Sequence, residues 1–227
     1  MGELFTAEFW DYFSPLLLTG TRDTLVMTVV STVFAYLLGL PLGVLLVLTG
    51  DHGICPHQTL NRCVGWVINV GRSLPFIILM VCVMPFTKIL VGTKIGVLGA
   101  IPPLVISAAP FIARMVETSL SEVDAGVVEA AQSMGASTFQ IVWKVYLPEA
   151  LPSLILGGSI SIITILAYTA IAGAIGAGGL GDLAIRSGYQ RREPAKMWVA
   201  AVLLIVLVQV IQSVFSRVSN RIDKRLK

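Results

Sequence analysis

Long apolar stretches with almost no charge dominate the pattern of hydrophobic and polar positions in this chain. They run over residues 25–48, 64–86, 95–112, 151–175 and 197–215. An α-helix rises about 1.5 Å per residue, so roughly 20 apolar residues cross about 30 Å of hydrocarbon. Backbone polar groups inside a bilayer must pair within the protein, so each stretch is expected to be helical. The pattern predicts an all-α membrane protein with five transmembrane helices.

Three of these stretches contain residues that a simple span lacks. Arg72 in the second stretch either lines a translocation pathway or extends its side chain to the inner interface. Pro102, Pro103 and Pro110 interrupt the third stretch. Tyr168 in the fourth either lines the pathway or packs against a neighbouring helix, and packing is the favoured interpretation.

The polar segment over residues 115–150 is too long for a simple turn. Capping-box patterns begin at Ser121 and at Ser137, and they predict two short helices. Gly135, between them, suits a helix end in the left-handed conformation. The segment is acidic, which favours docking into a groove of a partner protein over binding to anionic lipid. Its charged residues, with the preceding arginine, are Arg114, Glu117, Glu122, Asp124, Glu129, Lys144 and Glu149.

The composition excludes two broad classes of protein. Of the 227 residues, 56% are hydrophobic and 13% are charged, and mean hydropathy is +0.86. Soluble domains carry about 25% charged residues, so a soluble enzyme is excluded, and disordered chains are poorer in apolar residues. The net charge of +3 forms no basic stripe with interleaved aromatic residues, so no nucleic-acid partner is expected.

Basic residues divide almost evenly between the two sides of this topology, but a cluster follows the last stretch: Arg217, Arg221, Lys224, Arg225 and Lys227. The positive-inside rule therefore places the C-terminus in the cytoplasm and the N-terminus outside. The expected organisation is an extracytoplasmic segment over residues 1–20, a transmembrane domain over 21–217 and a basic cytoplasmic tail over 218–227.

Two further constellations have a weaker chemical meaning. The spacing of His52, Cys55, His57 and Cys63 matches no standard zinc site, so no metal site is predicted. The G-x-G-x-x-G pattern over residues 176–181 lacks the preceding strand and the distant acidic residue of a dinucleotide site. Its glycines are instead predicted to form a turn or a hinge at a gate: Gly176, Gly178, Gly179 and Gly181.

The residues also separate the classes of membrane function. An intramembrane enzyme needs a Ser–His pair, a metal cluster or paired carboxylates, and no histidine lies in the five stretches. An ion-coupled transporter places Asp, Glu or His at the bilayer midplane, and these stretches contain none, so that class is a remote alternative. The chain lacks the G-x-x-x-x-G-K-[ST] loop. A permease driven by a separate ATPase is the favoured class.

Several motifs resemble those of a known family. Glu129-Ala130-Ala131, Gly135 and the run from Val145 to Pro148 resemble the EAA loop of ABC importer permeases, E-A-A-x3-G-x9-I-x-L-P, with Val145 in place of isoleucine. The segments at 73–79, 85–87, 91–93, 108–114 and 176–181 resemble the permease subunits of bacterial methionine importers, which belong to the type I ABC importer transmembrane family. The resemblance extends from residue 21 to the C-terminus.

This resemblance implies a non-catalytic homodimeric permease in the bacterial inner membrane, which translocates L-methionine and also D-methionine and analogues. Two cytoplasmic ATP-binding subunits would hold ATP and Mg, and an extracytoplasmic methionine-binding protein would deliver the substrate. Another small neutral amino acid or a related solute is the alternative substrate. The residues implied to couple the permease to the ATPase are Glu129, Ala130, Ala131, Met134, Gly135, Val145, Leu147 and Pro148.

Overall fold

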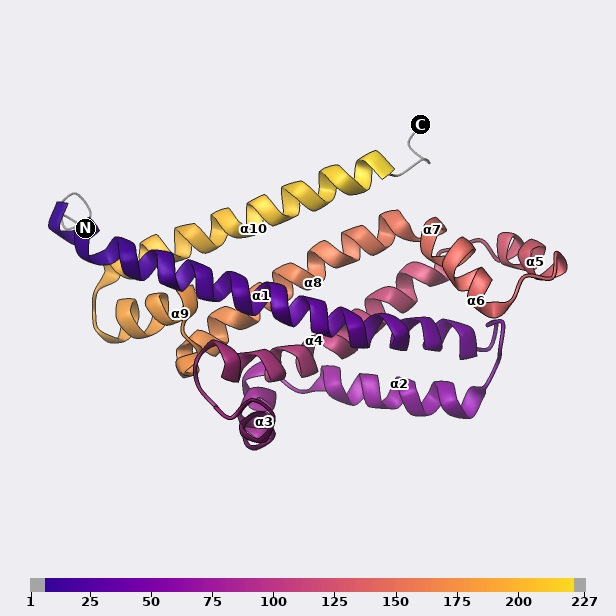
Figure 1. The fold of residues 1–227 in the computed structure, drawn as a ribbon, viewed down its shortest axis with the longest axis horizontal. Coiled ribbons are helices and arrows are strands. Elements are labelled where there is room, and N and C mark those ends of the chain that lie inside the picture. Colours follow the sequence, from indigo (N-terminus) through magenta and orange to yellow (C-terminus); the bar gives the residue numbers. More distant parts are fainter. Residues whose placement is uncertain (1–6, 223–227) are drawn as a thin grey trace. The chain divides into compact units, whose positions relative to one another are not determined.

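Four long helices form the framework of the computed structural model, which describes residues 7–222 (Figure 1). They are α1 (Ala7–Thr49), α4 (Gly96–Ser121), α8 (Leu151–Ala172) and α10 (Pro194–Ile222). Every regular element in the described part of the chain is helical. The shorter ones are α2 (Gln58–Ser73), α3 (Phe76–Val91), α5 (Ala125–Ser133), α6 (Thr138–Ile141), η2 (Val142–Tyr146), α7 (Leu147–Glu149), η3 (Gly173–Ala177), α9 (Gly179–Asp182) and η4 (Leu183–Gln190), where η marks a π-helical turn.

Helix length and apolar composition confirm the expected membrane architecture. Four segments among the described residues are long and apolar enough to cross a bilayer: Phe9–Thr49, Gly96–Ser121, Leu151–Ala177 and Pro194–Ile222. The bent pair formed by α2 and α3 makes a fifth if it is counted as one span.

The predicted span over residues 64–86 is not one helix. Helix α2 ends at Ser73 and α3 begins at Phe76. Pro75 lies in the break, with φ −57° and ψ 135°. Proline cannot donate a backbone hydrogen bond, and it disfavours helical geometry in the residue before it. The hydropathy pattern is insensitive to this local effect.

Three predicted boundaries differ from the helix ends in the structure. Helix α1 has 43 residues and begins at Ala7, so the predicted extracytoplasmic segment over 1–20 is helical from there on, while residues 1–6 lie outside the described residues. Helix α4 runs unbroken through its three prolines to Ser121, so the loop expected from residue 115 starts later. Helix α10 ends at Ile222, within the predicted basic tail, and residues 223–227 are not described.

Contacts divide the chain into two compact units. Of the described residues, the first comprises 7–33, 74–107 and 162–211, and the second comprises 34–73, 108–161 and 212–222. Each of the four long helices contributes one part to the first unit and its other part to the second.

Buried apolar residues form the cores of both units. In the first, Met27, Met80 and Leu104 are almost fully buried beside Phe76, whose ring stacks on that of Tyr168 with 4.6 Å between centroids. A neighbouring cluster joins the first turns of α1 to α10 through Phe13, Leu180, Leu183 and Ala200.

In the second unit, glycines bring α1 and α4 together. A Cβ atom added to Gly39 would lie 2.8 Å from the carbonyl oxygen of Ala109, and one added to Gly43 would lie 2.6 Å from that of Ala113. Small residues spaced four apart allow such close approach of membrane helices.

Candidate functional site

The segment with the EAA pattern folds as two short helices joined by a tight turn. Helix α5 begins after Asp124, whose carboxylate accepts a hydrogen bond from the Gly126 amide at 2.7 Å. At its end, Gly135 has φ +77°, the left-handed conformation expected from the sequence, and its amide donates to the Gln132 carbonyl at 2.9 Å.

The second predicted capping box is confirmed, and the first is wrong. At the start of α6, the Ser137 amide donates to the Gln140 side chain at 2.8 Å, and the Gln140 amide donates to the Ser137 hydroxyl at 3.3 Å. Ser121, by contrast, is the last residue of α4, and its hydroxyl donates to the Glu117 carbonyl at 2.8 Å. The short carboxylate of Asp124 caps α5 in its place.

Helices α5 to α7 expose several apolar side chains. Met134 is 81% exposed, Phe139 69% and Trp143 58%, and the last two rings meet edge to face at 6.3 Å. Val127 is also exposed, whereas Val128 and Ala131 are buried, so the apolar side chains of α5 are divided between the protein interior and the surface. Exposed apolar groups of this size are typical of a surface that docks a partner.

The other predicted coupling residues lie along the same segment. Glu129 and Ala130 are exposed on α5. Val145 and Leu147 are half-buried, at the end of η2 and the start of α7, and Pro148 is exposed.

A cavity of about 440 Å³ lies behind α5, bounded by the ends of α1 and α4 and by the loop after α1. The polar side chains that line it include His52, Asn61, Glu117, Glu129 and Tyr146. Tyr146 is 7% exposed, and burial raises the pKa of its phenol above the usual 10.0. The α5 face that carries Glu129 therefore borders a pocket with a partly polar lining.

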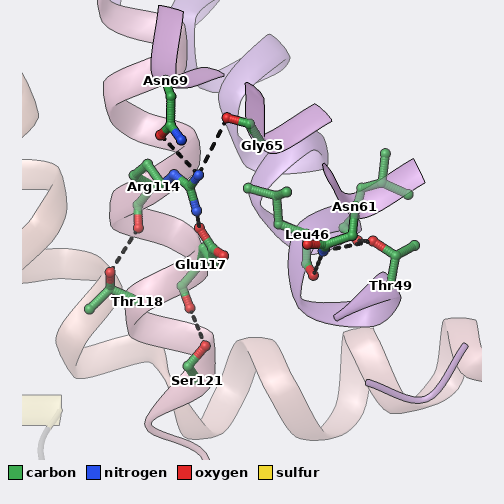
Figure 2. A network of polar contacts seen from close by, with 10 residues as sticks. Leu46, Thr49, Asn61, Gly65, Asn69, Arg114, Glu117, Thr118 and Ser121 are labelled. Atoms are coloured by element: carbon green, nitrogen blue, oxygen red, sulfur yellow. Dashed lines mark hydrogen bonds and ion pairs between the residues drawn. The ribbon is translucent and has the colours of Figure 1, made fainter. Parts of the chain in front are cut away.

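Hydrogen bonds tie the helix ends around this cavity together, as Figure 2 shows. Arg114 on α4 donates to the Glu117 carboxylate at 2.6 Å, to the Asn69 side chain at 3.0 Å and to the Gly65 carbonyl at 3.4 Å. Asn61 on α2 donates to the Leu46 carbonyl at 2.8 Å. Helix α2 is thereby joined to both α4 and α1.

The functional interpretation of the sequence missed this network. A signal was present, since Asn61, Gly65 and Asn69 are spaced four apart and share one face of α2. The partners on α1 and α4 could not be identified from spacing within α2 alone.

The loop with two histidines and a cysteine after α1 has local structural contacts. The His57 Nδ1 atom accepts a hydrogen bond from the Leu60 amide at 3.2 Å in the first turn of α2, and the Cys55 thiol lies 3.7 Å from the Thr138 hydroxyl at the start of α6. Within residues 7–222, no three His, Cys, Asp or Glu side chains gather closely enough to hold a metal ion.

The two candidate pathway residues have different surroundings. Arg72 is exposed in the last turn of α2, in the second unit. Tyr168 is half-buried in the first unit, where it stacks on Phe76. The stacking is the packing role favoured for Tyr168, and a pathway role for either residue stays a prediction.

The glycine-rich turn after α8 packs tightly against α1. Gly176, Gly178 and Gly179 all have positive φ, from +80° to +97°. The Leu180 amide donates to the buried Thr24 hydroxyl at 2.9 Å, and a Cβ on Gly179 would lie 2.7 Å from the same oxygen. Gly181 approaches the Ala170 backbone closely. A hinge at these glycines stays a prediction.

Comparison with known proteins agrees with this architecture. Residues 39–227 match the family described as binding-protein-dependent transport system inner membrane component. The chain is 49% identical over 219 residues to the probable D-methionine transport system permease protein MetI of Vibrio cholerae, covering 96% of this chain and 97% of that protein. It is 47% identical over 181 residues to the methionine import system permease protein MetP of Bacillus subtilis, covering 80% and 82%.

A solved structure gives the same result in three dimensions. The structure superposes on a chain of the inward-facing MetNI methionine ABC transporter with a TM-score of 0.92 and 46% sequence identity, over 93% of this chain and 98% of that one. The chain is therefore a multi-pass inner-membrane permease component that belongs to the binding-protein-dependent transport system inner membrane component family.

Proposed function

We propose that this chain is the transmembrane permease subunit of an ATP-driven ABC importer that translocates methionine, both L- and D-, into the cytoplasm. The observation that carries this proposal is the 49% identity over nearly the whole chain to a probable D-methionine permease. Helix α8, which contains no charged residue, suits a substrate without net charge. Another small neutral amino acid is the alternative substrate.

The α5–α7 segment is the site that receives force from two cytoplasmic ATP-binding subunits, which hold ATP and Mg. Support comes from its exposed apolar side chains, Met134, Phe139 and Trp143, and from the fixed turn at Gly135. A displacement of α5 would reach α1, α2 and α4 through the walls of the cavity and through the Arg114 and Asn61 hydrogen bonds.

The functional assembly contains two copies of the permease, the two ATP-binding subunits and an extracytoplasmic methionine-binding protein. ATP binding draws the ATP-binding subunits together, and the permease pair changes from an inward-facing to an outward-facing state. Each ligand must favour one of these states for the cycle to proceed.

The N-terminus lies outside the cell and the C-terminus in the cytoplasm. Basic residues after the last span support this orientation, since Arg217 and Arg221 follow a run of apolar residues on α10. The α5–α7 segment then faces the compartment in which ATP is available.

Uptake in cells tests the proposal. A methionine-auxotrophic bacterium without its own methionine importers would express this chain with its ATP-binding subunit and its methionine-binding protein. We expect accumulation of labelled L-methionine and D-methionine that stops when the ATP-binding subunit is omitted. Transport without that subunit, or uptake that excess methionine fails to compete, would overturn the proposal.

A further inference from the structure

An apolar groove lies between the first turns of α1 and α10, within the first unit. It encloses about 380 Å³. Trp10 and Leu17 of α1 form one wall, and the side chains of α10 between Trp198 and Val206 form the other. None of the lining residues is charged. The groove has a defined length, because Trp198 and Val206 are eight residues, or about 12 Å, apart along α10.

The charges on α10 give the depth of this groove in the bilayer. Lys196 precedes and Arg217 follows an uninterrupted run of uncharged residues. Trp198 and Arg217 are separated by about 28 Å of helix, close to the roughly 30 Å thickness of bilayer hydrocarbon. Tryptophan gathers at membrane interfaces. Trp198 and Trp10 thus lie at one headgroup boundary, and the groove extends from there into the acyl chains.

Exposed cations lie at the same end of α10. Arg191 and Arg192 are both exposed and are separated from the helix, which begins at Pro194, only by Glu193. Glu193 is paired with Lys196, whose ammonium lies 4.8 Å from the centre of the Tyr12 ring. Exposed Asp11 on α1 is an acidic residue at this end. Arginine guanidinium groups bind phosphate oxygens through paired hydrogen bonds, so a lipid phosphate has donors at this level.

The dimensions of the groove suit a single acyl chain, since it offers about 380 Å³ over a length of about 12 Å. An acyl chain in the groove leaves its polar headgroup at the level of the two tryptophans.

We propose that this groove is a binding site for one phospholipid from the leaflet at the N-terminal end of α10. One acyl chain lies along the groove, from the level of Trp198 to the level of Val206, and the phosphate contacts Arg191 and Arg192. The ligand class is a diacyl phospholipid, held by dispersion contacts along the chain and by charge at the headgroup.

Native tryptophan fluorescence tests the site. Replacing Trp66 and Trp143 by Phe in the full chain leaves Trp10 and Trp198 as emitters, and chain-brominated phosphatidylglycerol is titrated into the protein in a mild non-ionic detergent. We expect saturable quenching that corresponds to one lipid per chain. Filling the groove with Val202→Phe and Val206→Phe should raise the apparent Kd about tenfold, because the acyl chain loses its contacts.

Two further variants separate the site from general lipid contact and from misfolding. Ile205→Phe changes an exposed α10 position outside the groove and should leave the titration unchanged. Arg191→Ala with Arg192→Ala, outside the helices, should weaken binding while the final quenching stays the same. Quenching that never saturates, or that is equal in the parent and in the filled variant, would overturn the proposal. The proposal would also be overturned if the brominated lipid failed to quench the fluorescence of Trp10 and Trp198.

Discussion

Single residues fix the geometry of the α5–α7 segment. Gly135 has φ +77°, and a Cβ built there meets nothing within 4 Å, so the restriction comes from the backbone and not from space. Tyr146 places a buried phenol against the cavity behind α5. Both positions can be tested by substitutions that alter one property at a time.

Gly135→Val should reduce methionine uptake strongly. A left-handed backbone costs an L-residue about 1–2 kcal/mol, and a β-branched side chain fares worst there. Gly135→Asn should keep more activity, because Asn tolerates this conformation. Uptake and the amount of ATP-binding subunit that co-purifies provide the measurements. Equal activity of the two variants would contradict a role for the turn.

The raised pKa of Tyr146 predicts that folding stability depends on pH in the alkaline range. Because its folded-state pKa is raised, the phenol keeps its proton in the folded protein after the unfolded chain has lost it. The contribution of Tyr146 to the free energy of unfolding is therefore fully present below about pH 10 and is lost as the pH rises further. Thermal unfolding in detergent should show a smaller alkaline loss for Tyr146→Phe than for the unmodified protein. Identical pH dependence of the two would count against a buried, neutral phenol.

At the scale of elements, hydrogen bonds between helices fix which residues of two neighbouring helices face each other, and apolar packing alone does not specify this. Helix α2 is held to α4 by Arg114 and to α1 by Asn61. The glycine turn is held to α1 by the Thr24 hydroxyl. Each of these bonds sets the register of one helix against its neighbour.

Arg114→Ala should destabilise the second unit and impair uptake. It removes donors to Glu117 and Asn69, and hydrogen bonds of a charged group contribute about 1.5–3 kcal/mol, which partial exposure of the pair reduces here. Thermal unfolding and uptake are the measurements. The matched change Arg62→Ala, at an exposed arginine of α2, should leave both close to the parent values.

Thr24→Val should lower stability by about 1–3 kcal/mol, because it leaves the Leu180 amide without its acceptor. Thr24→Ser keeps the hydroxyl and should be nearly neutral. Thr32→Val is the control within the same helix, since the Thr32 hydroxyl donates to the Thr28 carbonyl of α1 itself. A similar loss in all three variants, measured by thermal unfolding, would show that the contact to the turn is not the cause.

At the scale of the whole molecule, the proposed orientation can be read from cysteine accessibility. A chain with Cys63→Ser and Cys82→Ser keeps exposed Cys55. A membrane-impermeant maleimide should label Cys55 only after the cells are permeabilised. With Cys55→Ser added, Tyr189→Cys on η4 should be labelled in intact cells. The reverse pattern would invert the topology.

Hydropathy located the membrane helices because burial in lipid imposes one requirement on every residue of a span. It did not place the boundary at Ser73–Phe76, where a single proline outweighs apolar neighbours, or the first turns of α1, where Asp11 interrupts the apolar run. The turn at Gly135 was predictable because a glycine's conformational freedom is a local property.

Contacts between distant parts of the chain were not predictable in this way. Thr24 and Leu180 are 156 residues apart, and nothing in the sequence around either residue identifies the other as its partner. The Arg114 network depends on which helix faces α4, and hydrophobic periodicity within one helix does not contain that information. The EAA pattern identified the α5–α7 segment, yet not the cavity behind it.

The length of α1 has a consequence for where its far end works. If Trp10 marks one headgroup layer, the 39 residues from there to Thr49 extend for about 58 Å along the helix. Even at a tilt of 40°, the helix covers roughly 45 Å along the membrane normal, which is well beyond the thickness of the bilayer hydrocarbon. The last turns of α1 then emerge on the opposite side as a stalk. There Leu46 is covered by protein, not lipid, beside Ile68 and Ala113. In the proposed orientation, this end of the first span lies in the cytoplasm, within reach of the ATP-binding subunits.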